Sequence, residues 1–217
     1  KVDEVANRID EVSSSYGAYL QDEIRLSHSL ILTAGLRDDY SDEYDTALSP
    51  RLGLLVKPCP RSEVFASVNR AYRAPSLADR FVKVEYFGML FEGNPNLDPE
   101  TLTAYEAGLR WRPIDAVQTA LTVFYNDLQD AFDYMMDLDG VFRNYNVTRE
   151  ITYGFEGEIH VEIIGGLSAF LNYTFTEGSY DEFPSDPSVE GKTLAYLARN
   201  KFNAGLEYSL EKFFSTQ

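Results

Sequence analysis

The sequence predicts an all-β protein, an antiparallel transmembrane β-barrel segment of about nine long strands. Three observations carry this prediction. Apolar and polar residues alternate with period 2 through almost every apolar stretch, and helical spacing is nearly absent. The alternating runs extend over roughly 10–20 residues, whereas strands in soluble sheets usually have about 3–10. Short connections alternate along the chain with longer and more variable ones, as they do at the two ends of a membrane barrel.

Each strand follows from its own alternating run. In Ile151–Ile163, Ile, Tyr, Phe and Val alternate with Thr, Glu and His, and only Gly157 interrupts the apolar series. Comparable runs predict strands over 13–26, 30–41, 48–57, 63–75, 100–113, 117–136, 142–163, 167–180 and 193–210. A tilted strand needs about 9–11 residues to cross a bilayer, so each of these runs is long enough to span.

The connections fall into two groups that belong to opposite ends of the barrel. The short ones are Ser27–Ser29, Pro58–Ser62, Ile114–Ala116 and Ile164–Gly166. The variable ones are Asp42–Ala47, Ser76–Pro99, Asp139–Gly140 and Asp181–Lys192. In outer-membrane barrels the short turns are periplasmic and the long loops extracellular, so we expect the Ser76–Pro99 connection to lie outside the cell.

The distribution of charge along the strands assigns their faces. Glu106, Arg110 and Arg112 share one face of a strand, and the opposite face carries only uncharged residues, among them Leu109 and Trp111. A lipid-facing Arg or Lys at mid-bilayer costs about 2–4 kcal/mol, so the charged face should line the lumen. Asp22 is an exception, because it falls in phase with apolar neighbours. The alternative interpretation is a large soluble antiparallel sheet with one wet face.

Composition excludes several other classes. The 217 residues carry a formal net charge of -16, which opposes nucleic-acid binding. A single cysteine, Cys59, excludes an intrachain disulfide framework and a cysteine-cluster metal site. No motif for a hydrolase, a phosphate-binding loop or a metalloenzyme occurs, so neither catalysis nor a cofactor is expected. The pair Glu156 and Glu158 is better explained by a polar lumen than by acid–base chemistry.

Several ordered motifs resemble a known family. They are YRAP (Tyr72–Pro75), SLADRF (Ser76–Phe81), GNPNLDPETLTAYEAGLRW (Gly93–Trp111), FYNDLQD (Phe124–Asp130), NYNVTREITYGFEGE (Asn144–Glu158), LNYTFTEG (Leu171–Gly178) and RNKFNAGLEYSL (Arg199–Leu210). In this order and spacing they resemble the C-terminal barrel half of TonB-dependent receptors, the plugged 22-stranded transporters of the Gram-negative outer membrane.

The resemblance implies active uptake of a bulky, scarce solute, typically a ferric siderophore, haem or cobalamin. The solute binds at the extracellular mouth, and the TonB complex of the inner membrane supplies energy through the plug. The plug, the first barrel strands and the closing strands have no counterpart here. We therefore expect residues 1–217 to form one partial barrel domain that does not transport alone. Its two open sheet edges should favour self-association. A passive porin or adhesin barrel and a soluble β-module are the alternatives.

The YRAP and NPNL motifs resemble the paired boxes of haem receptors, which carry a haem-ligating histidine between them. Residues 76–93 contain no histidine, and the two in the chain, His28 and His160, lie elsewhere. A ferric siderophore or cobalamin is therefore expected. The ligand-contacting residues we expect are Tyr86, Phe87, Phe91 and Arg73. Alternatively, these rings belong to the interfacial aromatic belt or to packing within the loop.

Acidic residues gather at two of the variable connections. They are Asp38, Asp39, Asp42, Glu43 and Asp45 at one, and Asp181, Glu182 and Asp186 at the other. Crowded carboxylates suit Ca²⁺, although the EF-hand spacing is absent and acidic loops are more often simply solvated.

Overall fold

A computed structural model describes residues 12–44, 46–184 and 186–209 of the chain. The long strands are β1 (Ser15–Ser27), β2 (Leu30–Ser41), β3 (Thr46–Cys59), β4 (Ser62–Arg73), β7 (Glu100–Ile114), β8 (Val117–Met136), β9 (Val141–Ile164), β10 (Leu167–Glu182) and β11 (Asn200–Tyr208). Each pairs antiparallel with its neighbour in the order β1-β2-β3-β4-β7-β8-β9-β10-β11. The nine predicted strands and their antiparallel arrangement are therefore confirmed.

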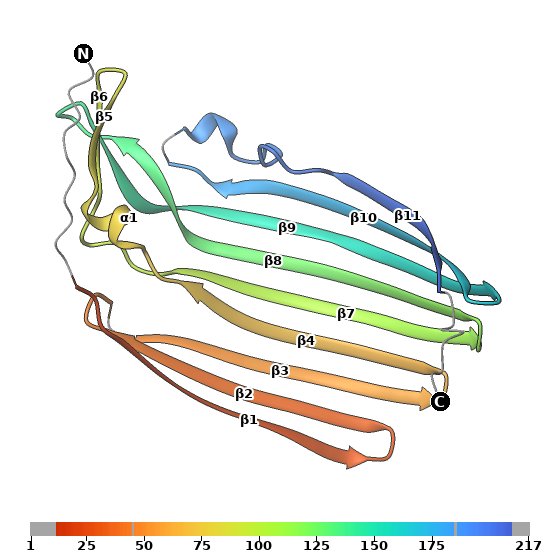
Figure 1. The fold of residues 1–217 in the computed structure, drawn as a ribbon. Helices are drawn as coiled ribbons and strands as arrows, with labels where there is room; N and C mark the ends of the chain where they lie inside the picture. The colour runs from red at the N-terminus through yellow and green to blue at the C-terminus, as the bar shows by residue number, and fades with distance from the viewer. Residues whose placement is uncertain (1–11, 45, 185, 210–217) are drawn as a thin grey trace, which may run out of the picture.

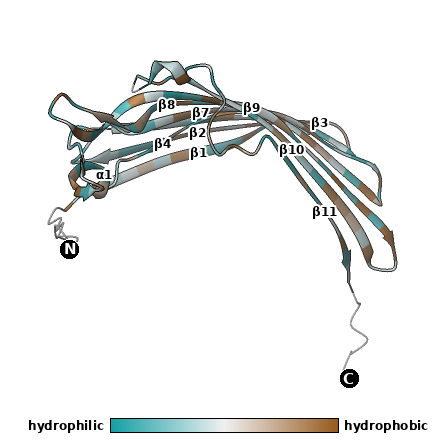
Figure 2. Cartoon of the chain, turned by 90° about the horizontal axis from the view of Figure 1, so that it is seen from above, coloured by the Kyte–Doolittle hydropathy of each residue, from teal (hydrophilic) through white to brown (hydrophobic). Residues whose placement is uncertain are grey.

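The sheet is an open, curved wall (Figures 1 and 2). Among the described residues, β1 pairs only with β2 and β11 only with β10. The four short turns lie together at one end of the wall, and the long connections lie at the other (Figure 1). We call these the turn end and the loop end. The β8–β9 hairpin projects furthest at the loop end, because β9 has 24 residues.

The structure adds four elements to the prediction, three of them in the connection between β4 and β7. These are a short helix, α1 (Leu77–Phe81), and a hairpin of two four-residue strands, β5 (Lys83–Tyr86) and β6 (Met89–Glu92). A 3-10 turn, η1 (Pro187–Val189), lies in the connection between β10 and β11. Four-residue strands are too short to produce a recognisable alternation, so the sequence pattern does not reveal them.

The last strand is shorter than predicted. The expected strand 193–210 begins only at Asn200, and residue 210 lies outside the described residues. Thr193 forms a single bridge with Ser179, and Tyr196 has φ 59°, which a strand does not allow. Leu194 and Leu197 instead pack close over Gly178 of β10. Their apolar spacing reflects loop packing rather than a strand.

Strand pairing confirms the two faces. Directly paired residues share a face, and Arg110 pairs with Glu63, while Trp111 pairs with Thr119. The sheet has almost no core of its own: within the described residues only three apolar side chains, Ala47, Leu97 and Ala131, are buried. Large exposed apolar side chains cover the face opposite the charged lumen face, as expected for a sheet in contact with lipid.

Asp22 lies on the apolar face, paired with Ala34, as its phase in the sequence predicts. In the described parts of the chain, no helix is long and apolar enough to cross a membrane.

Candidate ligand-binding site at the loop end

The connection between β4 and β7 is closed at its base by an ion pair. Arg73, the last residue of β4, donates two hydrogen bonds to the carboxylate of Glu100, the first residue of β7, one of them at 2.7 Å. The backbone N–H of Phe132 also donates to Glu100, at 2.9 Å. Arg73 lies over the Phe132 ring, 5.0 Å from its centroid. The two ends of the connection are thereby joined to each other and to β8.

The first part of this connection is a capped helix that carries a buried arginine. Ser76 and Asp79 cap α1 reciprocally, because each side chain accepts a hydrogen bond from the backbone N–H of the other. Arg80 is buried and donates to the side chain of Glu43 at 2.7 Å and to the carbonyl oxygen of Pro95. Arg80 therefore links the β2–β3 connection, through Glu43, to the return segment of the β4–β7 connection, through Pro95.

Two asparagines attach the return segment of the loop to β9. The Asn94 side chain donates to the carbonyl oxygen of Asn144 at 2.9 Å. The Asn146 side chain accepts from the N–H of Asp98 at 2.9 Å and donates to its carbonyl oxygen at 2.7 Å. Hydrogen bonds to backbone groups position the segment without requiring a regular element.

The β5–β6 hairpin is held against the projecting β8–β9 hairpin. Strand β6 pairs in parallel with the start of β9, with Phe91 opposite Phe142. The Phe91 ring stacks on Phe142 at 5.0 Å and meets Tyr134 edge-on at 5.4 Å. These rings form a small aromatic cluster, and aromatic pairs of this geometry contribute about 0.5–1.5 kcal/mol each beyond their buried area.

The tip of the hairpin exposes two aromatic rings. Tyr86 is 61% and Phe87 85% exposed, and their ring centroids lie 4.4 Å apart in an edge contact. Phe87 has φ 50° and Gly88 has φ 76°, the signs that a type I′ hairpin turn requires at its two central positions. Positive φ is uncommon for a bulky residue, and asparagine is the usual non-glycine choice. The tip therefore keeps an aromatic ring at a backbone position that disfavours it.

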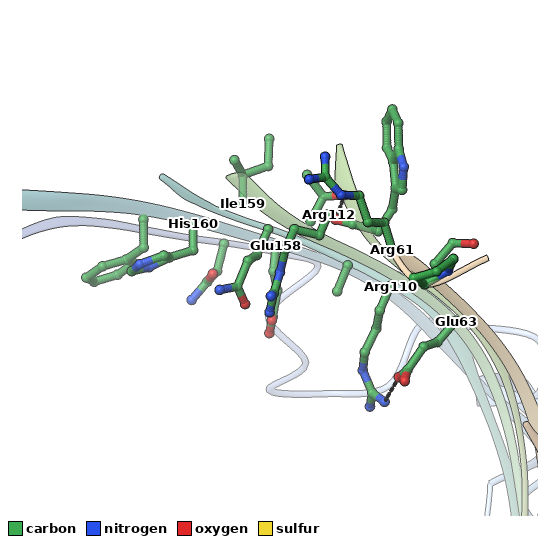
Figure 3. A pocket seen from close by; sticks show the side chains of 15 residues that line it. Arg61, Glu63, Arg110, Arg112, Glu158, Ile159 and His160 are labelled. Carbon is green, nitrogen blue, oxygen red and sulfur yellow. Dashed lines mark hydrogen bonds and ion pairs between the residues drawn. The ribbon is translucent and has the colours of Figure 1, made fainter. Parts of the chain in front are cut away.

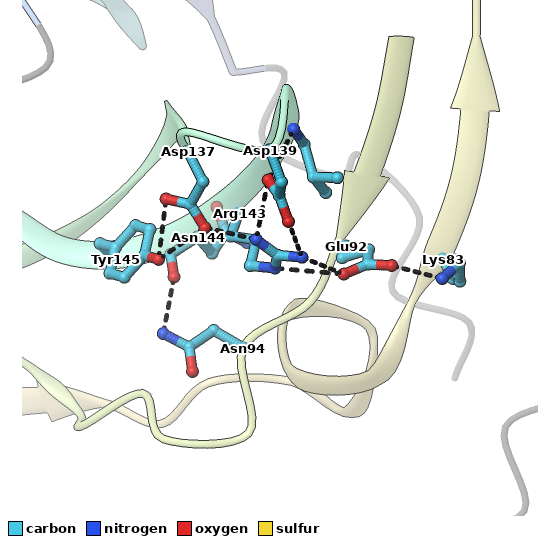
Figure 4. A network of polar contacts seen from close by, with 9 residues as sticks. Lys83, Glu92, Asn94, Asp137, Asp139, Arg143, Asn144 and Tyr145 are labelled. Carbon is cyan, nitrogen blue, oxygen red and sulfur yellow. Dashed lines mark hydrogen bonds and ion pairs between the residues drawn. The ribbon is translucent and has the colours of Figure 1, made fainter.

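The opposite face of the same hairpin carries a polar network (Figure 4). The guanidinium of Arg143 donates to Glu92 at 2.8 Å, to Asp139 at 3.1 Å and to Asp137. Glu92 also forms an ion pair with Lys83. Hydrogen bonds from Lys83 and then from Arg143 lower the pKa of Glu92, and Arg143 lowers the pKa of Asp139. These carboxylates are ionised at neutral pH.

A cavity of about 680 Å³ borders this network. Its lining is Glu92, Gly93, Asn94, Pro95, Asn96, Asp137, Arg143 and Tyr145. The sequence pattern does not indicate this group, because only the parallel pairing of β6 with β9 brings residues 92 and 143 together. The charged residues can be read from the sequence, but the contact of Glu92 with Arg143 depends on a pairing between segments about 50 residues apart.

A second cavity of about 590 Å³ lies at the turn end, against the concave face (Figure 3). Arg110, Glu63 and Glu158 point to the concave side, and Ile159 points to the convex side. The carboxylate of Glu63 forms ion pairs with the Lys57 ammonium at 2.7 Å and with the Arg110 guanidinium at 3.8 Å. His160, one of the two histidines, lines this cavity. Charges of both signs line the lumen here, in agreement with the assigned faces.

The acidic connections give no metal site within the described residues, where no group of three or more His, Cys, Asp or Glu side chains is placed to hold an ion. Protein donors already occupy several of the carboxylates: Thr46 donates to Asp38, the Ser14 N–H to Asp42, and Arg80 to Glu43. Asp45 lies outside the described residues.

The structure separates the four expected ligand-contacting residues into three groups. Tyr86 and Phe87 lie together at the exposed tip. Phe91 belongs to the aromatic cluster that anchors the hairpin, and Arg73 belongs to the ion pair that closes the loop. All four lie in or at the base of one connection at the loop end.

Comparison with known proteins places almost the whole chain in one family. The family model described as TonB dependent receptor-like, beta-barrel matches residues 3–216. The chain is 25% identical over 219 residues to the iron-regulated outer membrane virulence protein of Vibrio cholerae serotype O1, covering 94% of this chain and 33% of that protein. It is 29% identical over 233 residues to the heme/hemopexin utilization protein C of Haemophilus influenzae, covering 92% and 32%.

Among solved structures, the siderophore receptor PirA from Pseudomonas aeruginosa superposes with a TM-score of 0.69 and 27% identity, covering 78% of this chain and 35% of that one. The chain spans about a third of the length of the curated relatives that it matches.

Proposed function

The chain belongs to the TonB-dependent receptors, as part of their β-barrel, and on that premise we propose that it forms one wall of a receptor for active uptake of a ferric siderophore. It lies in the outer membrane of a Gram-negative bacterium, and its family is a class of transport receptors rather than of enzymes. In the proposal, residues 1–217 act as one barrel portion, and coupling to TonB runs through a plug domain.

The exposed aromatic tip at Tyr86 and Phe87 carries the proposal for ligand contact. Two large rings exposed to water at the tip of the β5–β6 hairpin, in the long β4–β7 connection, offer an apolar face to an incoming solute. The positive φ of Phe87 adds weight, because strained backbone is concentrated at functional sites. In the proposal, Tyr86 and Phe87 contact the chelate, while Phe91 and Arg73 hold the hairpin and the loop in place.

Haem and cobalamin are the competing solutes. A relative named for heme/hemopexin utilization makes haem the stronger of the two. However, residues 76–93 of this chain contain no histidine to bind haem iron. A direct comparison of binding by a ferric siderophore, haemin and cobalamin to the purified full-length receptor decides between them.

Substitutions at the tip test the site. Phe87→Asn removes the ring and gives the turn a residue that accepts positive φ. We expect affinity for the chelate to fall about 10-fold, or about 1.4 kcal/mol, while the hairpin becomes more resistant to proteolysis. Tyr86→Ala should also weaken binding. Leu138→Ala, which alters an exposed apolar residue of the neighbouring β8–β9 turn, is the control and should leave affinity unchanged.

Unchanged affinity in Phe87→Asn and in Tyr86→Ala would remove the tip from the binding site. Absence of binding of all three solutes to the unmodified receptor would remove the proposed substrate class.

A further inference from the structure

The negative charge of the chain is concentrated at the loop end. Four segments make up that end: residues 37–46, 73–100, 126–150 and 177–199. They contain 21 Asp and Glu against eight Lys and Arg, so they hold -13 of the net charge of -16. The rest of the chain, including the lumen-facing strands at the turn end, is close to balanced. A solute that approaches from outside therefore meets the acidic part of this wall first.

The cations of the loop end are already paired with carboxylates. Within the described residues, seven of the eight cationic side chains of these segments form ion pairs. The pairs are Arg37 with Asp39, Arg73 with Glu100, Arg80 with Glu43, Lys83 with Glu92, Arg143 with Glu92, Asp137 and Asp139, Arg149 with Asp127 and Asp181, and Arg199 with Glu177. The eighth cation is Lys192.

Several of these pairs hold the loops together and are not free to turn toward a ligand. Arg80 is buried and joins two connections, and Arg73 closes the base of the β4–β7 loop. Arg143 contacts three carboxylates at once. A ligand anion that recruited any of these guanidinium groups would leave carboxylates without their partner, which is costly for partly buried groups.

The aromatic tip of the β5–β6 hairpin also disfavours an anionic solute. Glu85 is exposed next to Tyr86, and Lys83 two residues earlier is paired across the hairpin with Glu92. The ring faces of Tyr86 and Phe87 carry negative electrostatic potential, so they favour neutral or cationic groups over anions.

From these observations we infer that the solute of this receptor is a neutral or cationic ferric chelate, of the hydroxamate kind, and not a polyanionic one such as a ferric tris-catecholate. The inference rests on the proposed function and narrows its substrate class. Three observations support it. The loop end carries a net negative charge, and in the part of the chain that the structure describes seven of its eight cationic side chains already form ion pairs with carboxylates of the same chain. The exposed rings of Tyr86 and Phe87 lie next to the carboxylate of Glu85.

A charge series on a single scaffold tests the inference. The probes are a linear ferric tris-hydroxamate with a terminal amine, its N-acetyl derivative and its N-succinyl derivative, which carry about +1, 0 and −1 charge at neutral pH. A ferric tris-catecholate, a trianion, is the fourth probe. Each is titrated into the purified full-length receptor at low and at high salt. We expect the amine and acetyl probes to bind at least about 10-fold more tightly than the succinyl probe and the trianion, with a smaller difference at high salt.

A fluorescent label at the tip of the β5–β6 hairpin measures the local electrostatic potential without any ligand. A Phe87→Cys variant in a Cys59→Ser background is labelled with a small neutral fluorophore, and quenching by iodide, acrylamide and caesium is compared. The control carries the label at Asp115, which is 89% exposed at the turn end. We expect iodide to quench the tip label about 2–5-fold less efficiently, relative to acrylamide, than the control label. Glu85→Gln should reduce that difference.

The outcomes separate the two proposals. Tight binding of the trianion with normal quenching by iodide overturns the inference on charge and leaves the receptor function intact. If none of the four chelates binds, the proposed siderophore function fails, and the quenching experiment still decides the charge of the approach surface. Reduced iodide quenching together with the expected order of affinities supports both.

Discussion

The ring of Phe124 on β8 lies over Gly154 on β9, directly opposite it on the lumen face. A Cβ added to Gly154 would come 2.9 Å from Cζ of this ring and 2.0 Å from the Phe175 carbonyl oxygen. Two other lumen-facing phenylalanines repeat the arrangement, Phe65 over Gly108 and Phe170 over Gly205. Aromatic rings that cover a glycine on the next strand fix strand register, so these pairs explain how a sheet without a core keeps its pairing.

Gly154→Ala should therefore destabilise the receptor by about 1–3 kcal/mol, because the added methyl group has no space and the wall must shift. Gly157→Ala, three residues along β9, is the matched control. A Cβ there meets nothing within 4 Å, so the change should be neutral or slightly stabilising. Thermal unfolding of the detergent-solubilised receptor measures both. Equal transition temperatures for the two variants would contradict the packing role of Gly154.

The ion pair at the base of the β4–β7 connection gives a second prediction. Glu100→Gln keeps the shape of the side chain but removes the charge that Arg73 and the Phe132 N–H contact. We expect the free energy of unfolding to fall by about 1–2 kcal/mol and proteolysis within residues 74–99 to become faster. Glu106→Gln, an exposed lumen-facing change on the same strand, should leave the cleavage rate as it is. Similar cleavage of both variants would show that the pair does not close the loop.

The aromatic cluster predicts how the β5–β6 hairpin is anchored. Phe91→Ala removes the ring that contacts Phe142 and Tyr134, and it should raise amide hydrogen exchange in residues 83–92 by about 10-fold or more. Phe87→Ala removes a ring that is 85% exposed, so exchange in the same residues should change little. If both variants exchange alike, the hairpin is held by its polar network rather than by Phe91.

Glu150 predicts a pH dependence. It lies on β9, 14 residues from the turn-end limit of the strand at Ile164, whereas a tilted strand spans a bilayer with about 9–11 residues. Burial raises the pKa of Glu150, and the nearby charges of Glu100 and Asp133 add to the effect. A carboxyl whose pKa is raised by folding stabilises the protein when protonated, and this contribution is lost as pH rises through the folded pKa. Glu150→Gln should therefore raise the melting temperature at pH 7.5, and the gain should vanish near pH 4.

Glu156→Gln, an exposed change on the same strand, is the control for that experiment and should show no such gain. A Glu150→Gln variant that is less stable than the wild type at pH 7.5 would refute the prediction.

Cys59 tests which end of the wall faces the periplasm. It is exposed at the turn end, and its pKa is lowered by a contact with the Ser62 hydroxyl and by the Arg61 backbone, so it should react readily with maleimides. A large polymer-linked maleimide should modify it only after the outer membrane is opened. Leu138→Cys in a Cys59→Ser background should react on intact cells. Labelling of Cys59 from outside would reverse the assigned orientation.

Much of the wall was predictable because its signal is local. The strand predicted over 142–163 reproduces β9 (Val141–Ile164) within one residue at each end, since β-strands place successive side chains on opposite faces whatever their partners are. The charges at Glu106 and Arg110 assigned the lumen face for the same reason. The segment 193–199 misled the prediction, because Leu194 and Leu197 pack over Gly178 and imitate a strand pattern.

By itself the sequence determined the strands, their faces and the two ends of the wall, because these depend on the period of the side chains and on the cost of charge in lipid. Only the tertiary structure decided how the candidate site is built. It placed Phe91 among anchoring rings, left Tyr86 and Phe87 exposed, and paired Arg143 and Arg80 with carboxylates from distant segments. Such contacts depend on which loop packs on which strand, and no local pattern of residues encodes that choice.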